Sequence, residues 1–568
     1  MLNNIDLTKK PFNLKESDIA WVEEQLAQMS LDEKIGQLFC LIGMAEEEQQ
    51  LVQLLAAFKP GGVMYRPMPG EQIQHIHRIL QNNSKLPLLL AANLEDGGSG
   101  SAIDGTYFGK PLQVAATDDE EMAYKLGLVA GREGGAVGVN WSFAPIVDID
   151  INFRNPITNV RTYGSDPQRV RKMAKAYMKG VHENGLAVSI KHFPGDGVDE
   201  RDQHLLTSIN SLSAEEWDDS FGMVYKELIE EGAQTVMVGH IMLPAYSKLL
   251  NPELKDEELM PATLSPEILQ GLLREKLGFN GLIVTDASIM AGFTIAEKRE
   301  IAVPKAIASG CDMFLFTKNI EEDYRFMLQG IEKGILTERR INEAVTRVLG
   351  LKASLKLHEK HEQNALVPPR EALSIVSCEE HQEWAKACAD LSVTLVKDRD
   401  RLLPIYPDEY KSILVYVLGD EGNHFSQSCS SLFVEKLRAE GFTIDLYDKA
   451  NVDLTEMFMP IEVLKAKYDL VIYFSNITTA SNQTVVRINW APPFGSDMPW
   501  FIREIPTLFI STANPYHLQD VPRMSTFING YSSNSFTVEA IIEKITGKSP
   551  FKGVNPVDPF CGYWEAKL

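Results

Sequence analysis

Short apolar runs alternate with amphipathic segments through roughly the first 350 residues of the chain. Continuous apolar runs of this length are typical of strands that helices cover on both faces, as in a parallel sheet. Eight such runs indicate a closed (β/α)8 TIM-type barrel, although an open doubly wound sheet gives the same alternation. The predicted strands lie at residues 35–42, 61–65, 87–92, 137–147, 186–191, 234–239, 281–286 and 311–316.

A second and shorter α/β series follows the barrel region. The intervening residues are polar and include Pro368 and Pro369, so we interpret residues 358–378 as a linker. The sequence therefore predicts a barrel domain over residues 1–357 and a smaller layered α/β (sandwich) domain over residues 379–568.

The role of the second domain stays open at this point. It could cap the barrel or mediate association. Alternatively, the long segment 482–495, which contains Trp490, could reach the active-site rim or another subunit.

Composition limits the classes of partner. The chain has 568 residues, 44% of them hydrophobic, and a net charge of −23, which disfavours nucleic acid and anionic membrane surfaces. The six cysteines form no Cys-x-x-Cys pair, which disfavours a thiolate metal site. We expect neither a metal nor a cofactor. Neither a signal peptide nor a membrane span is evident. We expect a cytoplasmic protein that acts on a small molecule, with an oligomeric state that the sequence does not define.

Polar residues follow most of the predicted barrel strands. In a TIM barrel, functional side chains gather at the carboxyl ends of the strands, so these residues are expected to share one rim. Carboxylates, an amide and basic groups at one rim are suited to a hydroxyl-rich ligand. The residues concerned are Asn93, Glu95, Asp96, Asp148, Arg161, Lys191, His192, His240 and Asp286.

Each of these residues also has a purely structural interpretation. Asp286 could cap the following helix, and His240 could be a hydrogen-bonded core histidine. The polar loop after Lys191-His192 carries Asp202 and His204, which taken alone would be ordinary loop residues. Their gathering at strand ends favours the functional interpretation.

Several motifs together resemble glycoside hydrolase family 3. They are FAPIVDI, RTYGSDP, KHFPGDG, DQH, PATLS and GLIVTDASIM, in this order. The D-x-H element resembles the β-N-acetylglucosaminidase branch, and the C-terminal region is similar to the second domain of the family's two-domain form. Separate motifs in the correct order are more specific than a single pattern match.

The resemblance implies a retaining exo-β-N-acetylglucosaminidase that removes terminal GlcNAc from small peptidoglycan- or chitin-derived saccharides, as in cell-wall recycling. Asp286 would attack the anomeric carbon and form a covalent glycosyl-enzyme. His204 would be the acid/base, oriented by Asp202, with a loop that moves at Gly195 and Gly197.

The resemblance also implies sugar-binding roles for several residues. Arg161 matches the family's R-[ST]-[FY]-G arginine, Lys191 and His192 would bind hydroxyl groups, and Met290 would pack on a sugar face. The usual I-D-x-E-G-G reads ANLEDGG here, which leaves Asn93 and Glu95 as alternatives for the sugar-binding carboxylate position.

Two further positions depart from the family pattern. K-H-F-P-G-H-G has Asp196 at its sixth position, and D-S-H has Gln203 at its centre.

Three other functions are weighed. A neutral histidine beside the anomeric carbon does not repel phosphate as a carboxylate would, which suits a GlcNAc phosphorylase of the same fold. The β-glucosidase and β-xylosidase members use a glutamate of the second domain and lack D-x-H. A sugar-binding protein without turnover is disfavoured, because the nucleophile and acid/base positions are both filled.

Overall fold

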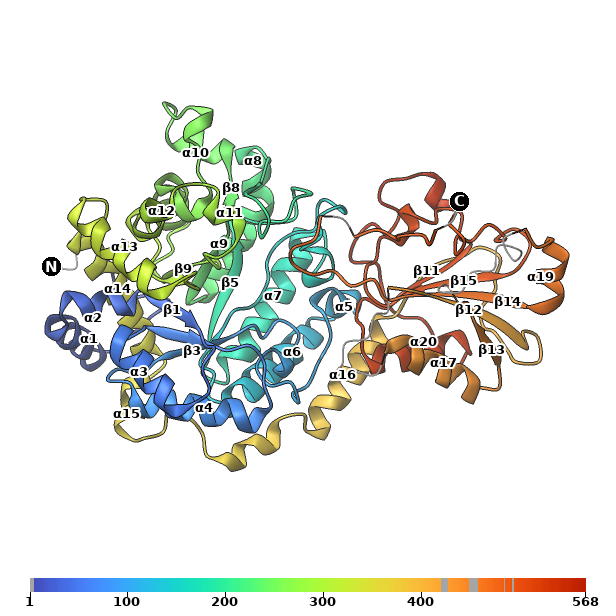
Figure 1. Cartoon of the computed structure of the whole chain (residues 1–568), viewed down its shortest axis with the longest axis horizontal. Coiled ribbons are helices and arrows are strands. Elements are labelled where there is room, and N and C mark those ends of the chain that lie inside the picture. The colour runs from blue at the N-terminus through green and yellow to red at the C-terminus, as the bar shows by residue number, and fades with distance from the viewer. Residues whose placement is uncertain (1–4, 420–427, 449–457, 485, 493–494) are drawn as a thin grey trace. The chain divides into compact units, whose positions relative to one another are not determined.

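The computed structural model describes residues 5–419, 428–448, 458–484, 486–492 and 495–568 (Figure 1). The chain divides into two compact units. Two short segments of the N-terminal half group with the C-terminal unit. The first unit comprises Met1–Phe108, Ala123–Thr158 and Pro167–Gln382, and the second comprises Gly109–Met122, Asn159–Asp166 and Glu383–Leu568.

The first unit is built on an eight-stranded parallel sheet in the order β10-β1-β2-β3-β4-β5-β7-β9. A parallel bridge between Val284 of β9 and Met313, just before β10, brings the two ends of this order together. The predicted TIM-type barrel is therefore confirmed. Its strands are β1 Phe39–Ile42, β2 Gly62–Met64, β3 Leu89–Ala92, β4 Trp141–Ser142, β5 Ala187–Phe193, β7 Thr235–Val238, β9 Leu282–Thr285 and β10 Phe314–Leu315.

Helices of the first unit surround these strands (Figure 1). They are α1 Glu16–Gln28, α2 Leu31–Gln37, α3 Glu48–Phe58, α4 Gly70–Asn83, α6 Glu120–Ala136, α7 Pro167–His182, α8 Ala214–Trp217, α9 Met223–Glu231, α10 Pro244–Leu250, α11 Ala291–Thr294, α12 Arg299–Ser309, α13 Ile320–Glu332, α14 Glu338–Ser354 and α15 Leu357–Glu362. The next helix, α16 Glu379–Ser392, starts in the first unit and lies mostly in the second. A two-stranded ribbon of β6 Ser208–Ile209 and β8 Ile241–Met242 lies outside the barrel sheet.

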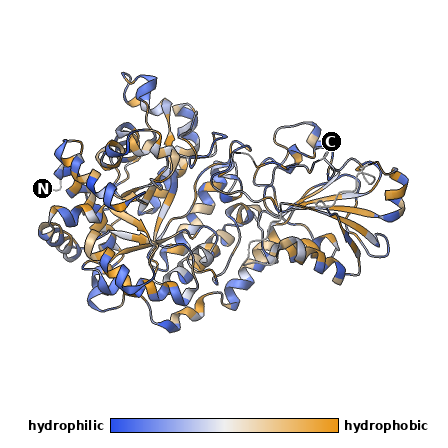
Figure 2. Ribbon diagram, viewed as in Figure 1, coloured by the Kyte–Doolittle hydropathy of each residue, from blue (hydrophilic) through white to orange (hydrophobic). Residues whose placement is uncertain are grey.

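Amphipathic spacing explains how the helices pack on the barrel. In α7 the buried residues include Val170, Met173, Tyr177 and Val181, which recur at the helical period. Figure 2 shows the same division, with orange strands inside and helices that carry blue outer faces. The apolar stripe of each helix therefore faces the strands.

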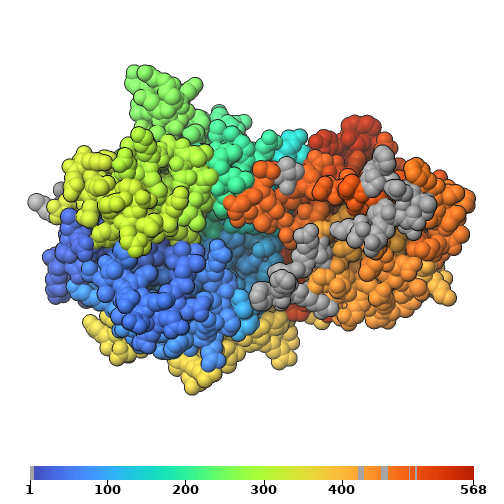
Figure 3. Space-filling view, viewed as in Figure 1, coloured from blue at the N-terminus to red at the C-terminus, as the bar shows by residue number. Residues whose placement is uncertain are grey.

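The first and last segments of the barrel lie side by side. In Figure 3 the blue N-terminal segments lie against the yellow-green segments around α12 and α13. This agrees with the parallel pairing of β1 with β10, in which Phe39 is opposite Phe314. Segments far apart in the sequence thus complete one cylinder.

The second unit contains a six-stranded sheet in the order β11-β16-β15-β14-β12-β13, in which only β11 is antiparallel to its neighbour. Alternate residues of β12 belong to different hydrophobic clusters, Ile413 and Val415 to one and Leu414 and Tyr416 to the other. Since successive side chains of a strand point to opposite faces, both faces of the sheet are covered, which confirms the predicted layered domain.

The elements of the second unit follow the α/β order. Residues 485, 493 and 494, within segment 482–495, lie outside the described residues, and the role suggested for that segment stays a prediction. The elements are α5 Pro111–Ala116, β11 Thr394–Asp398, β12 Ser412–Leu418, α17 Cys429–Ala439, β13 Thr443–Leu446, α19 Ile461–Lys467, β14 Leu470–Ser475, β15 Thr507–Ser511, β16 Thr526–Asn529 and α20 Ser535–Ile545.

Among the described residues, no helix is long and apolar enough to cross a bilayer.

Candidate active site

The predicted site residues of the barrel lie at the carboxyl ends of its strands. Asn93 and Glu95 follow β3, and Asp286 directly follows β9. Parallel strands of one barrel end at the same rim, so these side chains face a common space.

Lys191 joins both candidates for the sugar-binding carboxylate position. Its ammonium Nζ lies 2.7 Å from Oε1 of Glu95 and donates to Oδ1 of Asn93 at 3.2 Å. Lys191 is buried, which strengthens its attraction to the carboxylate. Asn93 and Glu95 therefore occupy one cluster around the same cation, and either can present an acceptor to a hydroxyl group.

His192 is oriented by Asp148. The imidazole Nδ1 lies 2.6 Å from Oδ2 of Asp148, and the backbone N–H of His192 donates to Oδ1 at 3.0 Å. An ionised carboxylate only accepts hydrogen bonds, so it fixes the proton on Nδ1. The other ring nitrogen, Nε2, lies 4.0 Å from Oδ2 of Asp286.

Asp286 lies in a cluster of imidazoles. Burial acts to raise the pKa of its carboxyl group, but the charges of His192, His240 and His204 and the N–H of Ala287 together lower that pKa below its usual value. The Ala287 N–H donates to Oδ1 of Asp286 at 2.7 Å. Asp286 is therefore a carboxylate at neutral pH, the form that a nucleophile needs.

His240 has no nitrogen left for a saccharide. It is fully buried, its Nδ1 is bonded to Oγ1 of Thr263, and its Nε2 is bonded to the carbonyl of Ala287, each at 3.1 Å. Burial lowers the pKa of His240. The sequence predicted direct substrate binding, whereas these contacts give His240 a supporting position next to Asp286.

Asp202 and His204 form a hydrogen-bonded pair on the loop after β5. Nδ1 of His204 lies 2.7 Å from Oδ1 of Asp202, which also accepts the backbone N–H of His204 at 2.8 Å. The Asp202 side chain is completely buried, whereas 24% of the His204 side chain is exposed. The pairing leaves Nε2 as the nitrogen of His204 that is available to a ligand.

The loop is held against the segment that follows Asp286. The carbonyl of His204 accepts the N–H of Ala291 at 2.9 Å, and the charge of His204 helps to lower the pKa of Asp286. The predicted nucleophile and the predicted acid/base therefore lie at the same end of the barrel.

The two positions that depart from the family pattern contact one another. Nε2 of Gln203 donates to Oδ2 of Asp196 at 3.2 Å. Both residues are buried, and burial, together with the nearby charge of Asp148, raises the pKa of Asp196 to about 6.

The two loop glycines are closely packed. Gly195 has a φ of 121° and Gly197 a φ of 104°. A methyl group at Gly195 would lie 2.2 Å from the ring of Phe221, and one at Gly197 would lie 2.0 Å from the carbonyl oxygen of Ile149. The structure gives both glycines a steric requirement, and the loop motion predicted for them stays a prediction.

Two further predicted binding residues lie at the ends of short helices. Arg161 ends the short helix η2, Asn159–Arg161, and belongs to a segment that groups with the second unit. Met290 is the N-cap of α11 and is 5% exposed. Their proposed contacts with a sugar stay predictions.

Residues 30–351 match the family model described as "Glycosyl hydrolase family 3 N terminal domain". The chain belongs to glycoside hydrolase family 3. This confirms the resemblance that the sequence motifs carried.

Relatives of this family 3 chain include enzymes that are named for different activities. The "Beta-N-acetylglucosaminidase/beta-glucosidase" of Cellulomonas fimi is 46% identical over 99% of this chain and 100% of its own length. The "Beta-hexosaminidase" of Pseudomonas aeruginosa strain PAO1 is 32% identical, over 40% of this chain and 66% of the relative.

Solved structures agree with this assignment. The structure "Beta-glucoside phosphorylase BglX bound to 2FGlc" has 47% identity and a TM-score of 0.94, and the match covers 98% of this chain and 99% of that one. A family 3 β-N-acetylglucosaminidase from Paenibacillus sp. shares the fold with a TM-score of 0.78 at 23% identity.

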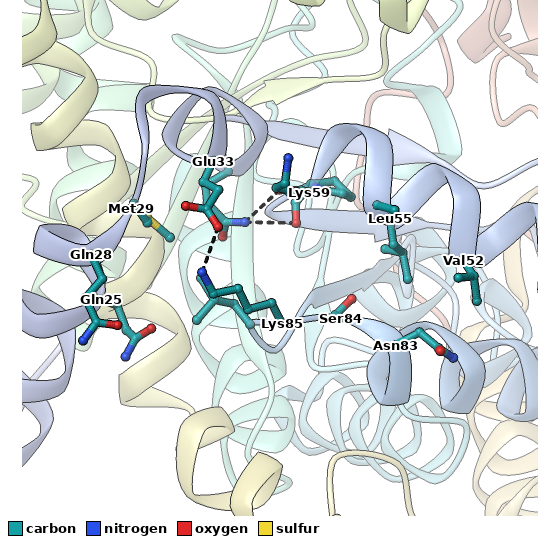
Figure 4. Close-up of a pocket in the computed structure, with 14 residues that line it drawn as sticks. Gln25, Gln28, Met29, Glu33, Val52, Leu55, Lys59, Asn83, Ser84 and Lys85 are labelled. Carbon is teal, nitrogen blue, oxygen red and sulfur yellow. Dashed lines mark hydrogen bonds and ion pairs between the residues drawn. The ribbon is translucent and has the colours of Figure 1, made fainter.

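A pocket at the other end of the barrel is separate from this site. This cavity, of about 220 Å³, lies among α1 to α4, and its lining includes Leu55, Pro60 and Leu86. Figure 4 shows several of the side chains that line it. Pro60 and Leu86 precede β2 and β3, so the cavity lies at the amino ends of these strands. Family 3 chemistry is expected at the opposite, carboxyl end.

In the described part of the chain, one group has ligand atoms close enough together to hold a metal ion. It consists of Asp18, His358 and Glu359. The ammonium group of Lys356 lies 2.8 Å from both carboxylate oxygens of Asp18. Because a cation already neutralises this carboxylate, the group is better described as an ion-pair cluster.

Asp148, Asp196 and Gln203 are the residues whose importance the sequence did not reveal. Asp148 was only one of several polar residues after strands, and the other two were only departures from a motif. Their side chains act on other side chains, and a sequence pattern does not show such contacts.

Proposed function

We propose that this family 3 enzyme is a retaining β-glycoside phosphorylase that acts on β-glucosides and N-acetyl-β-glucosaminides. The observation that carries the proposal is the Asp202–His204 pair, because it offers an imidazole in place of the second carboxyl group that most retaining enzymes use. Two nearly full-length relatives support the choice, one named a beta-glucoside phosphorylase and one named for both sugars.

In the first step the glycosidic bond is exchanged for an ester bond. An oxygen of the Asp286 carboxylate attacks C1, and the C1–O bond to the leaving group breaks. The imidazolium of His204 gives its Nε2 proton to the leaving oxygen, and Asp202 stabilises the imidazolium before transfer. The products of the step are the free alcohol, the glycosyl-enzyme and a neutral His204.

In the second step an oxygen of phosphate attacks C1 and the Asp286 carboxylate leaves. His204 takes up a proton from the hydrogen phosphate or from solvent, which restores the imidazolium. A neutral imidazole does not repel an approaching phosphate anion, whereas a carboxylate at that position would. Two successive inversions give a sugar 1-phosphate with the original anomeric configuration.

The remaining strand-end residues would bind the sugar. Lys191, Glu95 and Asn93 offer a donor and two acceptors in one cluster, which suits a pair of neighbouring hydroxyl groups. His192 would bind a hydroxyl near C1, because its Nε2 lies next to Asp286. The predicted cytoplasmic location and role in cell-wall recycling stay predictions.

The test is product identification with an aryl β-glucoside and its 2-acetamido analogue, with and without phosphate. We expect phosphate to increase turnover, a sugar 1-phosphate to be the product by ³¹P NMR, and Asp286→Ala to abolish release of the aryl group. Free sugar as the main product, at a rate that phosphate leaves unchanged, would contradict phosphorolysis.

Hydrolytic release of terminal GlcNAc is the second candidate. The D-x-H motif and the 32% identity to a beta-hexosaminidase favour it. Chitobiose and GlcNAc–MurNAc separate the two candidates, because a hydrolase releases free GlcNAc from both in phosphate-free buffer at its full rate.

A further inference from the structure

The side chain of Gln203 connects the proposed acid/base loop to two strand ends. Its Nε2 donates to Asp196, in the turn after β5, and its Oε1 accepts the backbone N–H of His240, just after β7, at 2.8 Å. A carboxylate can only accept and a backbone N–H can only donate, so the two partners define the orientation of the amide. Both ends of the Gln203 amide are therefore used.

The backbone of the same residue contacts α11, the short helix that follows β9 and Asp286. The carbonyl of Gln203 accepts the N–H of Gly292 at 3.2 Å, beside the bond from Ala291 to His204. A methyl group at Gly292 would lie 2.4 Å from that carbonyl oxygen. The loop backbone is thus packed directly on the segment that follows the proposed nucleophile.

The burial of Gln203 contrasts with its surroundings. Gln203 is 1% exposed, whereas Glu200 and Arg201 are exposed and Leu205 is 37% exposed. A buried amide with both ends bonded, next to the buried Asp202 and between the exposed residues on either side, fixes the loop at this residue. The neighbours on either side of it are Asp202 and His204.

Asp196 links this point to the other side of the site. Its Oδ1 accepts from Nδ2 of Asn155 at 2.9 Å and from the N–H of Gly197 at 2.7 Å, which leaves Oδ2 for Gln203. The backbone N–H of Asp196 donates to Asp148 at 2.8 Å, and Asp148 orients His192. One network thus connects the groups on both sides of Asp286.

We propose that Asp196 and Gln203, here called the Asp196–Gln203 pair, are positioning residues that hold His204 where it can protonate the leaving group. The family usually has a histidine at the position of Asp196 and a serine at the position of Gln203. The two residues found here complement each other, because their side chains are directly hydrogen-bonded. The inference rests on the proposed function, since it concerns the proposed acid/base.

The experiment uses four variants of the full chain: Gln203→Ala, Gln203→Glu, Asp196→Asn and the double variant Asp196→Asn/Gln203→Glu. Gln203→Glu sets two carboxylates against each other. The double variant exchanges carboxylate and amide, so that Nδ2 of the new asparagine can donate to the new glutamate, which still accepts the His240 N–H. Glu200→Gln, in the exposed part of the loop, is the matched control.

The readout is kcat/KM for aryl and alkyl β-glycosides whose leaving groups span a wide pKa range. A displacement of about 1 Å can reduce a rate ~100-fold, so we expect losses of about 10- to 100-fold for poor leaving groups in Gln203→Ala and Gln203→Glu. Little loss is expected for 2,4-dinitrophenyl glycosides, which need no proton. The double variant should recover most of the loss of Gln203→Glu.

Equal losses for all leaving groups, or a double variant no better than Gln203→Glu, would overturn the proposal. His204→Ala is measured in parallel to separate the two levels of inference. If His204→Ala lacks the leaving-group dependence, the proposed acid role fails. If the loss in kcat/KM depends on the leaving group in His204→Ala but not in the Gln203 variants, only the role of the Asp196–Gln203 pair fails.

Discussion

Two opposing effects act on the carboxyl group of Asp286. Burial disfavours its charge, and the surrounding imidazoles favour it, with His192 the strongest among them. The net result is a lowered pKa, so the group is ionised well into the acidic range. A buried carboxylate is thereby available as a nucleophile without a further base.

Removing His192 is expected to shift the acidic limb of the pH profile. In His192→Gln the main charge that lowers the pKa of Asp286 is lost, and burial then raises that pKa. Since only the carboxylate attacks C1, kcat/KM for an activated aryl glycoside should fall at a higher pH than in the unaltered enzyme. An acidic limb that does not move would show that His192 has no such effect. A loss of about 10-fold or more at neutral pH is expected as well, because His192 also lies at the proposed sugar site.

At the scale of elements, the site depends on loops packed at the carboxyl ends of β5, β7 and β9. The loop after β5 carries the Asp202–His204 pair, and the segment after β9 carries Asp286 and the backbone donors Ala291 and Gly292. Close approach between the two requires a residue without a side chain at position 292.

Gly292→Ala tests this requirement. The added methyl group would lie 2.4 Å from the carbonyl oxygen of Gln203, so the loop must move. We expect kcat for a poor leaving group to fall about 10-fold or more, with a smaller effect on thermal stability. Gly135→Ala in α6 is the control, because its methyl group would have an ordinary contact, 3.6 Å from Leu186. If Gly292→Ala retains full activity, the close packing is not needed for catalysis.

The sequence predicted the existence of the barrel strands better than their bounds. All eight barrel strands were predicted, because each is a compact apolar run. Their bounds were less accurate: residues 35–37 were assigned to the first strand but end α2, which starts at a capping box of Ser30 and Glu33. The run 137–147 contains only the two-residue strand β4. Apolar residues before a buried strand are hard to distinguish from the strand itself.

At the scale of the whole molecule, the two ends of the barrel have different roles. The carboxyl end holds the proposed chemistry. The amino end holds a buried ion cluster in which Asp312, just before β10, lies between Arg274, Arg340 and Arg347. Burial acts to raise the pKa of Asp312, but the three guanidinium groups outweigh it and lower that pKa. The cluster joins α14 to the strands and contributes to stability.

Asp312→Asn should therefore affect stability and not the chemistry. Loss of the carboxylate leaves three buried or nearly buried cations without their shared partner, which typically costs about 3–5 kcal/mol of the free energy of unfolding. Urea denaturation measures this loss, and KM of the folded variant is expected to stay unchanged. Backbone carbonyl groups also accept hydrogen bonds from Arg274 and Arg340. A variant as stable as the parent would show that these hydrogen bonds suffice to stabilise the buried guanidinium groups.

The sequence by itself determined the succession of strands and helices, the two layered architectures and the family, because apolar periodicity and motif order are properties of the linear chain. It also placed Asp286 at a strand end and put Asp202 and His204 in the loop after another strand. Only the tertiary structure decided that His240 is enclosed, that Asp148 orients His192, and that Asp196 meets Gln203. Such pairings depend on side-chain direction and on distances of about 3 Å, which chain folding sets and residue order does not encode locally.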